Sequence, residues 1–185
     1  MNIAEDGPEG YRPAQLEDLR GIEWLEQSLF DDTTYQYTIL RQLYAVSGKH
    51  WLVAELNGKM IGHALVLIGA DKTLLASLAV AEDYQNKGIG RRLLGKALEA
   101  CVDADVSVIE LTVRPDNVRA RRVFDQAGFT IVDKDDHYFG PDQARLVMEC
   151  ELAAREVSPR TLERRYSDFL SATSALSTHQ GSVTV

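Results

Sequence analysis

The chain has 185 residues, 45% of them hydrophobic, and its 28 acidic and 20 basic residues leave a formal net charge of −8. This length suits one domain with a sizeable core. The acidic balance argues against general binding to nucleic acid or to anionic membranes, and it is compatible with a cationic amine substrate. No apolar run reaches the length of a transmembrane helix, and the first residues lack the pattern of a secretory signal.

The cysteine and histidine content argues against a metal centre. Cys101 and Cys150 are too few and too far apart for a disulfide framework or a metal site. The four histidines show no ligand spacing either. We therefore expect no metal and a reducing, cytoplasmic location.

In chain order, residues 1–9 are predicted to be a flexible lead-in to a domain that spans residues 10–152. Apolar residues at helical spacing predict a helix over 15–30, and a second helix is expected over 35–46. Apolar and β-branched runs then predict strands over 51–56, 60–68, 74–81 and 106–113.

Turn and cap residues join these elements. Asn57-Gly58 predicts a tight hairpin between the first two strands. Asn117 is a natural N-cap for a helix over 118–126, and Gly128 is suited to its C-terminal end.

The most informative segment follows the third predicted strand, where the loop Gln85–Gly90 leads directly into an amphipathic helix. Glycines at the start of a helix let a ligand approach the backbone closely, and the first N–H groups of a helix have no partner within it. With the positive end of the helix dipole, these N–H groups form an anion site. Lys87, Arg91 and Arg92 add positive charge. The segment predicts a ligand that carries phosphates.

Spacing narrows the choice of ligand. The ATP-binding loop needs Gly-x-x-x-x-Gly-Lys followed by Ser or Thr, and the chain has no such string. A dinucleotide fingerprint needs a third glycine where the chain has Leu93. Glu110 lies twenty residues past Gly90, so this spacing alone leaves a Rossmann domain open.

Four segments resemble the GNAT N-acetyltransferases. Gln85-x-x-Gly88-x-Gly90 resembles their acyl-CoA loop. Asn117-x-x-Ala120-x-x-x-Phe124-x-x-x-Gly128-Phe129 resembles their second signature. Residues 136–141 and 145–148 resemble the closing hairpin of the subgroup that includes ribosomal-protein alanine N-acetyltransferases. The resemblance covers roughly residues 10–152.

The resemblance implies an α/β GNAT fold, in which a mixed, mostly antiparallel seven-strand sheet has helices on both faces. A V-shaped cleft is expected at the centre, between Val80 and Val113. Acetyl-CoA would bind there as co-substrate, and the Val80 N–H would polarise the thioester carbonyl. The residues implied in coenzyme binding are Leu78, Ala79, Val80, Gln85, Asn86, Lys87, Gly88, Ile89, Gly90, Arg91, Asn117 and Phe124.

The proton-transfer residues depart from the subgroup's pattern. Thr112 stands at the position of its general base, a Glu, and Phe124 stands at the position of its general acid, a Tyr. Glu110, two residues before Thr112 on the same strand face, is a candidate base. Tyr138, in the closing hairpin, is a candidate to contact the acceptor or protonate the thiolate. Residues 142–144, Asp-Gln-Ala, replace the usual Gly-Glu-Asp.

These features predict an acetyl-CoA-dependent N-acetyltransferase that acts on a primary amine of a small molecule or peptide, by direct attack in a ternary complex. One alternative is a protein N-terminal (α-amino) acetyltransferase. Another is a non-catalytic acyl-CoA sensor that kept the coenzyme cleft and lost the acid–base pair.

Residues 153–185 form an extension that the family core does not need. Ser158-Pro159 and the apolar positions that follow predict a helix over 159–176, with a disordered tail after it. The apolar face of that helix is expected to pack on the domain or on a second subunit, which leaves a homodimer open.

Overall fold

The computed structural model describes residues 10–30 and 34–152. The predicted lead-in over 1–9, and the extension over 153–185 with its predicted helix over 159–176, lie outside the described residues.

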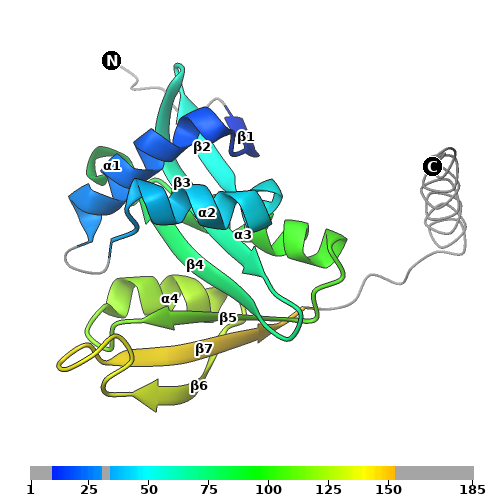
Figure 1. Ribbon diagram of the computed structural model, residues 1–185. Helices are drawn as coiled ribbons and strands as arrows, with labels where there is room; N and C mark the ends of the chain where they lie inside the picture. The colour runs from blue at the N-terminus through cyan, green and yellow to red at the C-terminus, as the bar shows by residue number, and fades with distance from the viewer. Residues whose placement is uncertain (1–9, 31–33, 153–185) are drawn as a thin grey trace, which may run out of the picture. The chain divides into compact units, whose positions relative to one another are not determined.

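A seven-stranded sheet in the order β1-β2-β3-β4-β5-β7-β6 forms the centre of the fold (Figure 1). All neighbouring strands run antiparallel except β4 and β5, which run parallel. The predicted mixed, mostly antiparallel sheet is confirmed. The strands are β1 (Gly10–Pro13), β2 (Leu52–Leu56), β3 (Lys59–Ile68), β4 (Thr73–Val80), β5 (Val108–Val113), β6 (Thr130–Asp135) and β7 (Arg145–Glu151).

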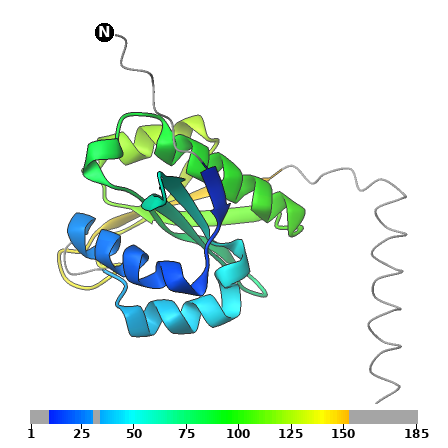
Figure 2. The same ribbon diagram turned by 90° about the horizontal axis from the view of Figure 1, so that it is seen from above.

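Helices cover both faces of the sheet, as predicted. Figure 2 shows α1 and α2 on one face and α3 and α4 on the other. The helices are α1 (Leu19–Leu29), α2 (Tyr37–Ser47), α3 (Ile89–Asp103) and α4 (Val118–Gln126). Short 3-10 turns precede α1 (Leu16–Asp18), follow α2 (Gly48–His50) and follow β4 (Glu82–Tyr84).

The core on the α1/α2 face is built around Trp51. Leu19 and Ile22 of α1 are fully buried, because their spacing of three places them on one side of the helix. They pack with Leu40, Val53 and Leu65 in one cluster. The Trp51 indole N–H donates to the Val66 carbonyl at 3.0 Å, so its polar atom is satisfied inside this core.

The core on the α3/α4 face follows from strand alternation. Ile109, Leu111 and Val113 of β5 lie two residues apart and therefore point to the same face. They pack in one cluster with Leu93 of α3 and Phe124 of α4. Both helices are thereby fixed against the sheet, which sets the direction in which the N-terminus of each points.

The central opening of the sheet arises between its two parallel strands. In the register of β4 and β5 a single pair, Leu74 with Glu110, is matched. On the other side of β4, Leu65 pairs with Ser77 and Val66 pairs with Leu75, so Ala76 is an extra residue. A bulge of this kind bends a strand and increases its twist. From this point β4 diverges from β5, and the predicted V-shaped opening is confirmed.

Several elements lie where the cap and turn residues of the sequence predict them. The predicted helix over 118–126 matches α4 residue for residue. Asn57 and Gly58 have positive φ angles of 52° and 72°, as the primed turn of a tight hairpin requires, and they join β2 to β3. The first helix begins later than predicted, because Leu16–Asp18 form a 3-10 turn before it.

Gly62 and Gly95 give a matched stability test. A Cβ on Gly62 lies 2.8 Å from the Ala79 carbonyl oxygen and 3.0 Å from Leu93. Gly62→Ala is therefore expected to lower the free energy of unfolding by about 1–3 kcal/mol. Gly95 lies inside α3 with no atom near its Cβ position, so Gly95→Ala should raise it by about 1 kcal/mol. Urea denaturation measures both, and a Gly62→Ala variant as stable as wild type contradicts the packing described.

Candidate active site

The loop after β4 forms an anion site from backbone groups. Gly88, the N-cap of α3, has φ 81°, and Asn86 has φ 64°, so the chain turns sharply through left-handed positions. The Arg92 N–H donates to the Gly88 carbonyl at 3.1 Å. Ile89, Gly90 and Arg91 precede that bond, and their N–H groups have no acceptor within the helix. These N–H groups and the helix dipole favour a phosphate.

Side chains around this loop fasten it to its neighbours. Gln85 donates from Nε2 to the Val80 carbonyl at 2.9 Å, and its Oε1 accepts a hydrogen bond from Arg119 of α4 at 3.0 Å. Arg91 donates to the side chain of Gln126, at the end of α4. Gln85 and Arg91 thus hold the loop between β4 and α4, while its backbone N–H groups remain available to a ligand.

Along β4, the backbone N–H groups of alternate residues point toward the opening. The Ala81 N–H donates to the Ile61 carbonyl of β3 at 2.9 Å. Successive residues of a strand direct their N–H groups to opposite sides, so those of Val80 and Leu78 point away from β3, toward the opening. Ala79 pairs with His63, and its N–H faces β3. The expectation that Ala79 offers its main chain to the coenzyme is therefore corrected, while Leu78 and Val80 keep their position.

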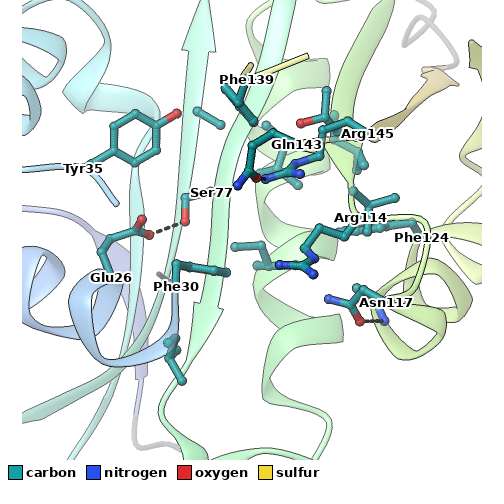
Figure 3. Close-up of a pocket in the computed structure, with 18 residues that line it drawn as sticks. Glu26, Phe30, Tyr35, Ser77, Arg114, Asn117, Phe124, Phe139, Gln143 and Arg145 are labelled. Carbon is teal, nitrogen blue, oxygen red and sulfur yellow. Dashed lines mark hydrogen bonds between the residues drawn. The ribbon is translucent and has the colours of Figure 1, made fainter. Parts of the chain in front are cut away.

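The divergence of β4 from β5 leaves a cleft of about 380 Å³, whose walls Figure 3 shows in close-up. One wall comes from α1, the segment after it and β4, and the other from β5, α4 and the start of β7. The cleft is lined by Glu26, Leu29, Phe30, Tyr35, Leu75, Ala76, Ser77, Leu78, Leu111, Thr112, Val113, Arg114, Asn117, Ala120, Phe124, Phe139, Gln143 and Arg145.

Asn117 and Phe124 both lie on the β5 side of this cleft. The Asn117 Oδ1 accepts the Ala120 N–H at 3.0 Å, which makes Asn117 the N-cap of α4, as predicted. Its side-chain NH₂ takes no part in that bond. Phe124 is buried and packs on Phe129 with ring centroids 5.8 Å apart, so its ring forms part of the apolar floor.

Thr112 lines the cleft, but the candidate base Glu110 does not line it. The Glu110 carboxylate accepts a hydrogen bond from Lys72 at 2.7 Å, beside the point where β4 and β5 still pair. This contact raises the pKa of Lys72 above its ordinary value. Glu110 therefore has a charge partner at the closed end of the opening, and the structure does not bring it to the reaction centre.

Tyr138 lies in the loop between β6 and β7, where its ring contacts Phe139 edge-on with centroids 4.8 Å apart. Phe139 lines the cleft, whereas Tyr138 does not. Tyr138 is more than one-third exposed, at 37%. Its charge contributes to raising the pKa of Tyr35, which lines the cleft, so Tyr138 lies near the cleft without lining it.

The structure brings a buried carboxylate, which the sequence analysis missed, to the α1 wall. Glu26 lies four residues after Ile22, on the buried side of α1, and is 1% exposed. His63 Nε2 donates to its Oε1 at 2.8 Å, and the Ser77 hydroxyl donates to the same oxygen. Two signals in the sequence point to this buried carboxylate. One is a glutamate on the apolar stripe of a helix, four residues after Ile22, and the other is a histidine inside the apolar run of β3.

Two arginines face this carboxylate from the opposite wall (Figure 3). Arg114, directly after β5, forms an ion pair with Asp116 at 3.1 Å. Arg145, the first residue of β7, is only 7% exposed. Burial and the nearby charge of Arg114 lower the pKa of Arg145, against the opposing effect of Asp116. Tyr35, across the cleft, has its pKa raised by burial and by the charge of Glu26.

The family model described as "Acetyltransferase (GNAT) family" matches residues 16–129, well over half of the chain. The chain belongs to the GNAT acetyltransferase family. The matched region contains the anion-binding loop, the diverging strands and α4. As a member of this family, the chain is an acyltransferase with acetyl-CoA as its co-substrate.

Curated relatives from two bacteria place the chain near one subgroup of GNAT enzymes. It is 32% identical over 111 residues to the ribosomal protein bS18-alanine N-acetyltransferase of Haemophilus influenzae, covering 57% of this chain and 75% of the relative. It is 33% identical over 84 residues to the enzyme of the same name from Escherichia coli K12, covering 44% of this chain and 57% of the relative.

Solved GNAT structures share the fold. The crystal structure of Ard1 from Thermoplasma volcanium matches with a TM-score of 0.71 at 21% identity, over 77% of this chain and 97% of that one. The PaiA N-acetyltransferase from Thermoplasma acidophilum, solved with coenzyme A, matches with a TM-score of 0.63 at 20% identity, over 77% of this chain and 98% of that one. A Rossmann domain is thereby ruled out.

Across 10–30 and 34–152, no helix is both long and apolar enough to cross a bilayer. The same residues contain no cluster of three or more His, Cys, Asp or Glu side chains arranged to hold a metal ion. Cys101 and Cys150 are buried free thiols, and burial raises the pKa of Cys101 to about 11.

Gly90, in the first turn of α3, tests the anion site. Its Cβ position lies 3.6 Å from Val80, an ordinary contact, and valine adds bulk beside the N–H groups that have no acceptor within the helix. Gly90→Val is expected to weaken coenzyme A binding by at least about tenfold, or 1.4 kcal/mol, in isothermal titration calorimetry. Gly95→Ala, farther along α3, is the control and should bind normally. Unchanged affinity in Gly90→Val means that the diphosphate binds elsewhere.

Proposed function

We propose that the chain transfers the acetyl group of acetyl-CoA to a primary amine of a small molecule or peptide, by direct attack in a ternary complex. One observation carries the proposal: the N–H groups of Leu78 and Val80 point into an opening that a phosphate-binding helix terminus adjoins. An extended acyl-pantetheine arm suits such a strand edge, and the diphosphate suits the loop.

Each group then has a place in the reaction. The Val80 N–H lies at the end of β4, where it can donate to the thioester oxygen as charge develops on it. The amine nitrogen bonds to the acetyl carbon, the carbon–sulfur bond breaks, and the proton lost from nitrogen balances the thiolate that leaves. Phe124 and Leu78 line the space next to the reacting atoms and exclude water from it.

The missing base at Thr112 favours amines of low pKa. At pH 7 about a tenth of α-amino groups are neutral, against about one lysine side chain in a few thousand. An α-amine therefore needs less help from a general base than a lysine does. This difference supports an α-amino acceptor over a lysine side chain.

A protein N-terminal acetyltransferase is the second candidate. It is favoured by the similarity to enzymes named for acetylating the alanine of ribosomal protein bS18. Phe30 and Phe139 both line the cleft, and their apolar side chains suit contact with the first residues of a peptide. A non-catalytic acyl-CoA sensor is the third candidate, since Thr112 and Phe124 lack the subgroup's acid–base functions.

Thiol release from acetyl-CoA separates these candidates. The acceptors are small primary amines, free amino acids and a peptide that begins with alanine, each tested with wild-type protein at pH 7 to 9. We expect release that depends on the acceptor and rises with pH as the neutral amine fraction grows. Binding of acetyl-CoA without release on any acceptor supports the sensor and contradicts catalysis.

Thr112→Glu restores a carboxylate at the subgroup's position. Thr112 is half-buried on the cleft wall, so the variant should leave coenzyme A affinity within about twofold of wild type. It should raise the rate on lysine-like amines relative to α-amines, because the less acidic amine gains more from a base. Steady-state rates with both amine classes and calorimetry with coenzyme A measure this, and Thr112→Gln is the neutral control. A large loss of coenzyme affinity in Thr112→Glu contradicts the position given to this residue.

A further inference from the structure

The two walls of the cleft carry opposite charge. Glu26 lies on the α1 wall, and Figure 3 shows the Arg114 and Arg145 side chains reaching toward it from the other side. Charged groups in a narrow cleft act on a ligand more strongly than on a solvated surface, because less water screens them. The two walls therefore favour an acceptor that has a positive group at one end and a negative group at the other.

Arg145 is a buried arginine whose side-chain contacts within residues 10–30 and 34–152 include no carboxylate. Its guanidinium donates to the Ala144 carbonyl at 2.8 Å and to Gln143 Oε1 at 3.4 Å, and it lies over the Phe139 ring at 4.9 Å. All of these partners are neutral. No ion pair to Arg145 is found among the residues that the structure describes. A buried charge is normally paired, so an anion is expected to complete this site.

The sheet face distinguishes an acceptor's anion from the coenzyme's phosphates. Leu146 and Met148 of β7 pack in the core on the α3/α4 face. Residues alternate along a strand, so Arg145 and Val147 point to the opposite face. The phosphate-binding loop leads into α3, and α3 packs on the same face of the sheet as Leu146 and Met148. Arg145 therefore lies on the side of the sheet from which the acceptor approaches.

Glu26 supplies the opposite charge on that same side. His63 Nε2 and the Ser77 hydroxyl both donate to Oε1, and Oε2 takes part in neither bond. His63 Nδ1 has no hydrogen-bond partner among the described residues. The cluster is not a nucleophilic triad, because His63 uses one nitrogen for both contacts. It holds a carboxylate at the cleft wall, where an ammonium group is attracted.

We propose that the acceptor is a small amine that also carries an acidic group, with its acid on Arg145 and its amine on the Glu26 side. The inference rests on the proposed function and narrows its substrate class to short peptides that carry both a free α-amine and a free carboxylate. The cleft of about 380 Å³ must also admit the acyl end of the coenzyme, so the space left suits a small acceptor. In this role Arg145 is a specificity residue, and Glu26 positions the amine.

The test compares each acid with its own carboxamide. Alanyl-alanine, alanyl-glycine and glycyl-alanine, and the three carboxamides, are titrated by calorimetry into protein saturated with coenzyme A, so that binding is read without turnover. Each acid is expected to bind at least about tenfold more tightly than its carboxamide. The same six compounds are then assayed as acceptors by thiol release.

Variants assign the preference to particular side chains. Arg145→Met should reduce the acid-to-carboxamide ratio to near one, and Arg145→Lys, which keeps the charge, should restore part of it. Arg122→Met is the matched control, because Arg122 is an exposed arginine of α4 outside the cleft lining, and it should keep the wild-type ratio. Glu26→Gln should weaken acid and carboxamide alike, since both share the amine.

The outcomes separate the inference from the proposed function. Equal binding of acid and carboxamide, no binding of any acid, or a ratio that Arg145→Met leaves intact overturns the inference. A preference for acids that depends on Arg145 supports it, whether or not thiol is released. Tight binding of acids without thiol release contradicts the proposed catalysis alone.

Discussion

A single matched register pair, Leu74 with Glu110, joins the two parallel strands at the centre of this sheet, and the opening depends on it. After Leu74 along β4, the bulge at Ala76 bends this strand away from β5. If the two strands stayed paired, the N–H groups of Leu78 and Val80 would donate hydrogen bonds to β5. The separation leaves the N–H groups of a strand edge unpaired at the centre of the sheet.

The sheet also sorts the chemistry onto its two faces. The loop that starts α3 offers backbone N–H groups, which bind a diphosphate through geometry and dipole with little dependence on side chains. The α1/α2 face carries Glu26, Thr112 and Arg145, to which we assign the choice of acceptor. On this proposal coenzyme binding tolerates sequence change, whereas acceptor choice changes with one or two substitutions.

Local features of the sequence predicted local structure well. The Asn57-Gly58 turn, the Asn117 cap and the glycine-containing mouth of α3 each follow from the φ angles or hydrogen bonds of a few adjacent residues. The contacts that define the acceptor side join distant segments: Glu26 and Ser77 are 51 residues apart. No local pattern pairs such residues. For the same reason Glu110 was expected near the reacting atoms, although Lys72 holds its carboxylate at the closed end of the opening.

Amide hydrogen exchange, followed residue by residue with and without acetyl-CoA, shows whether the unpaired edge of β4 and the start of α3 bind the coenzyme. Acetyl-CoA should slow exchange at Leu78 and Val80 and at Ile89, Gly90 and Arg91. The amides of Ala79 and Ala81, which face β3, should change little. Binding of acetyl-CoA that leaves Leu78 and Val80 unprotected, or that protects residues away from this opening, would contradict this mode of binding.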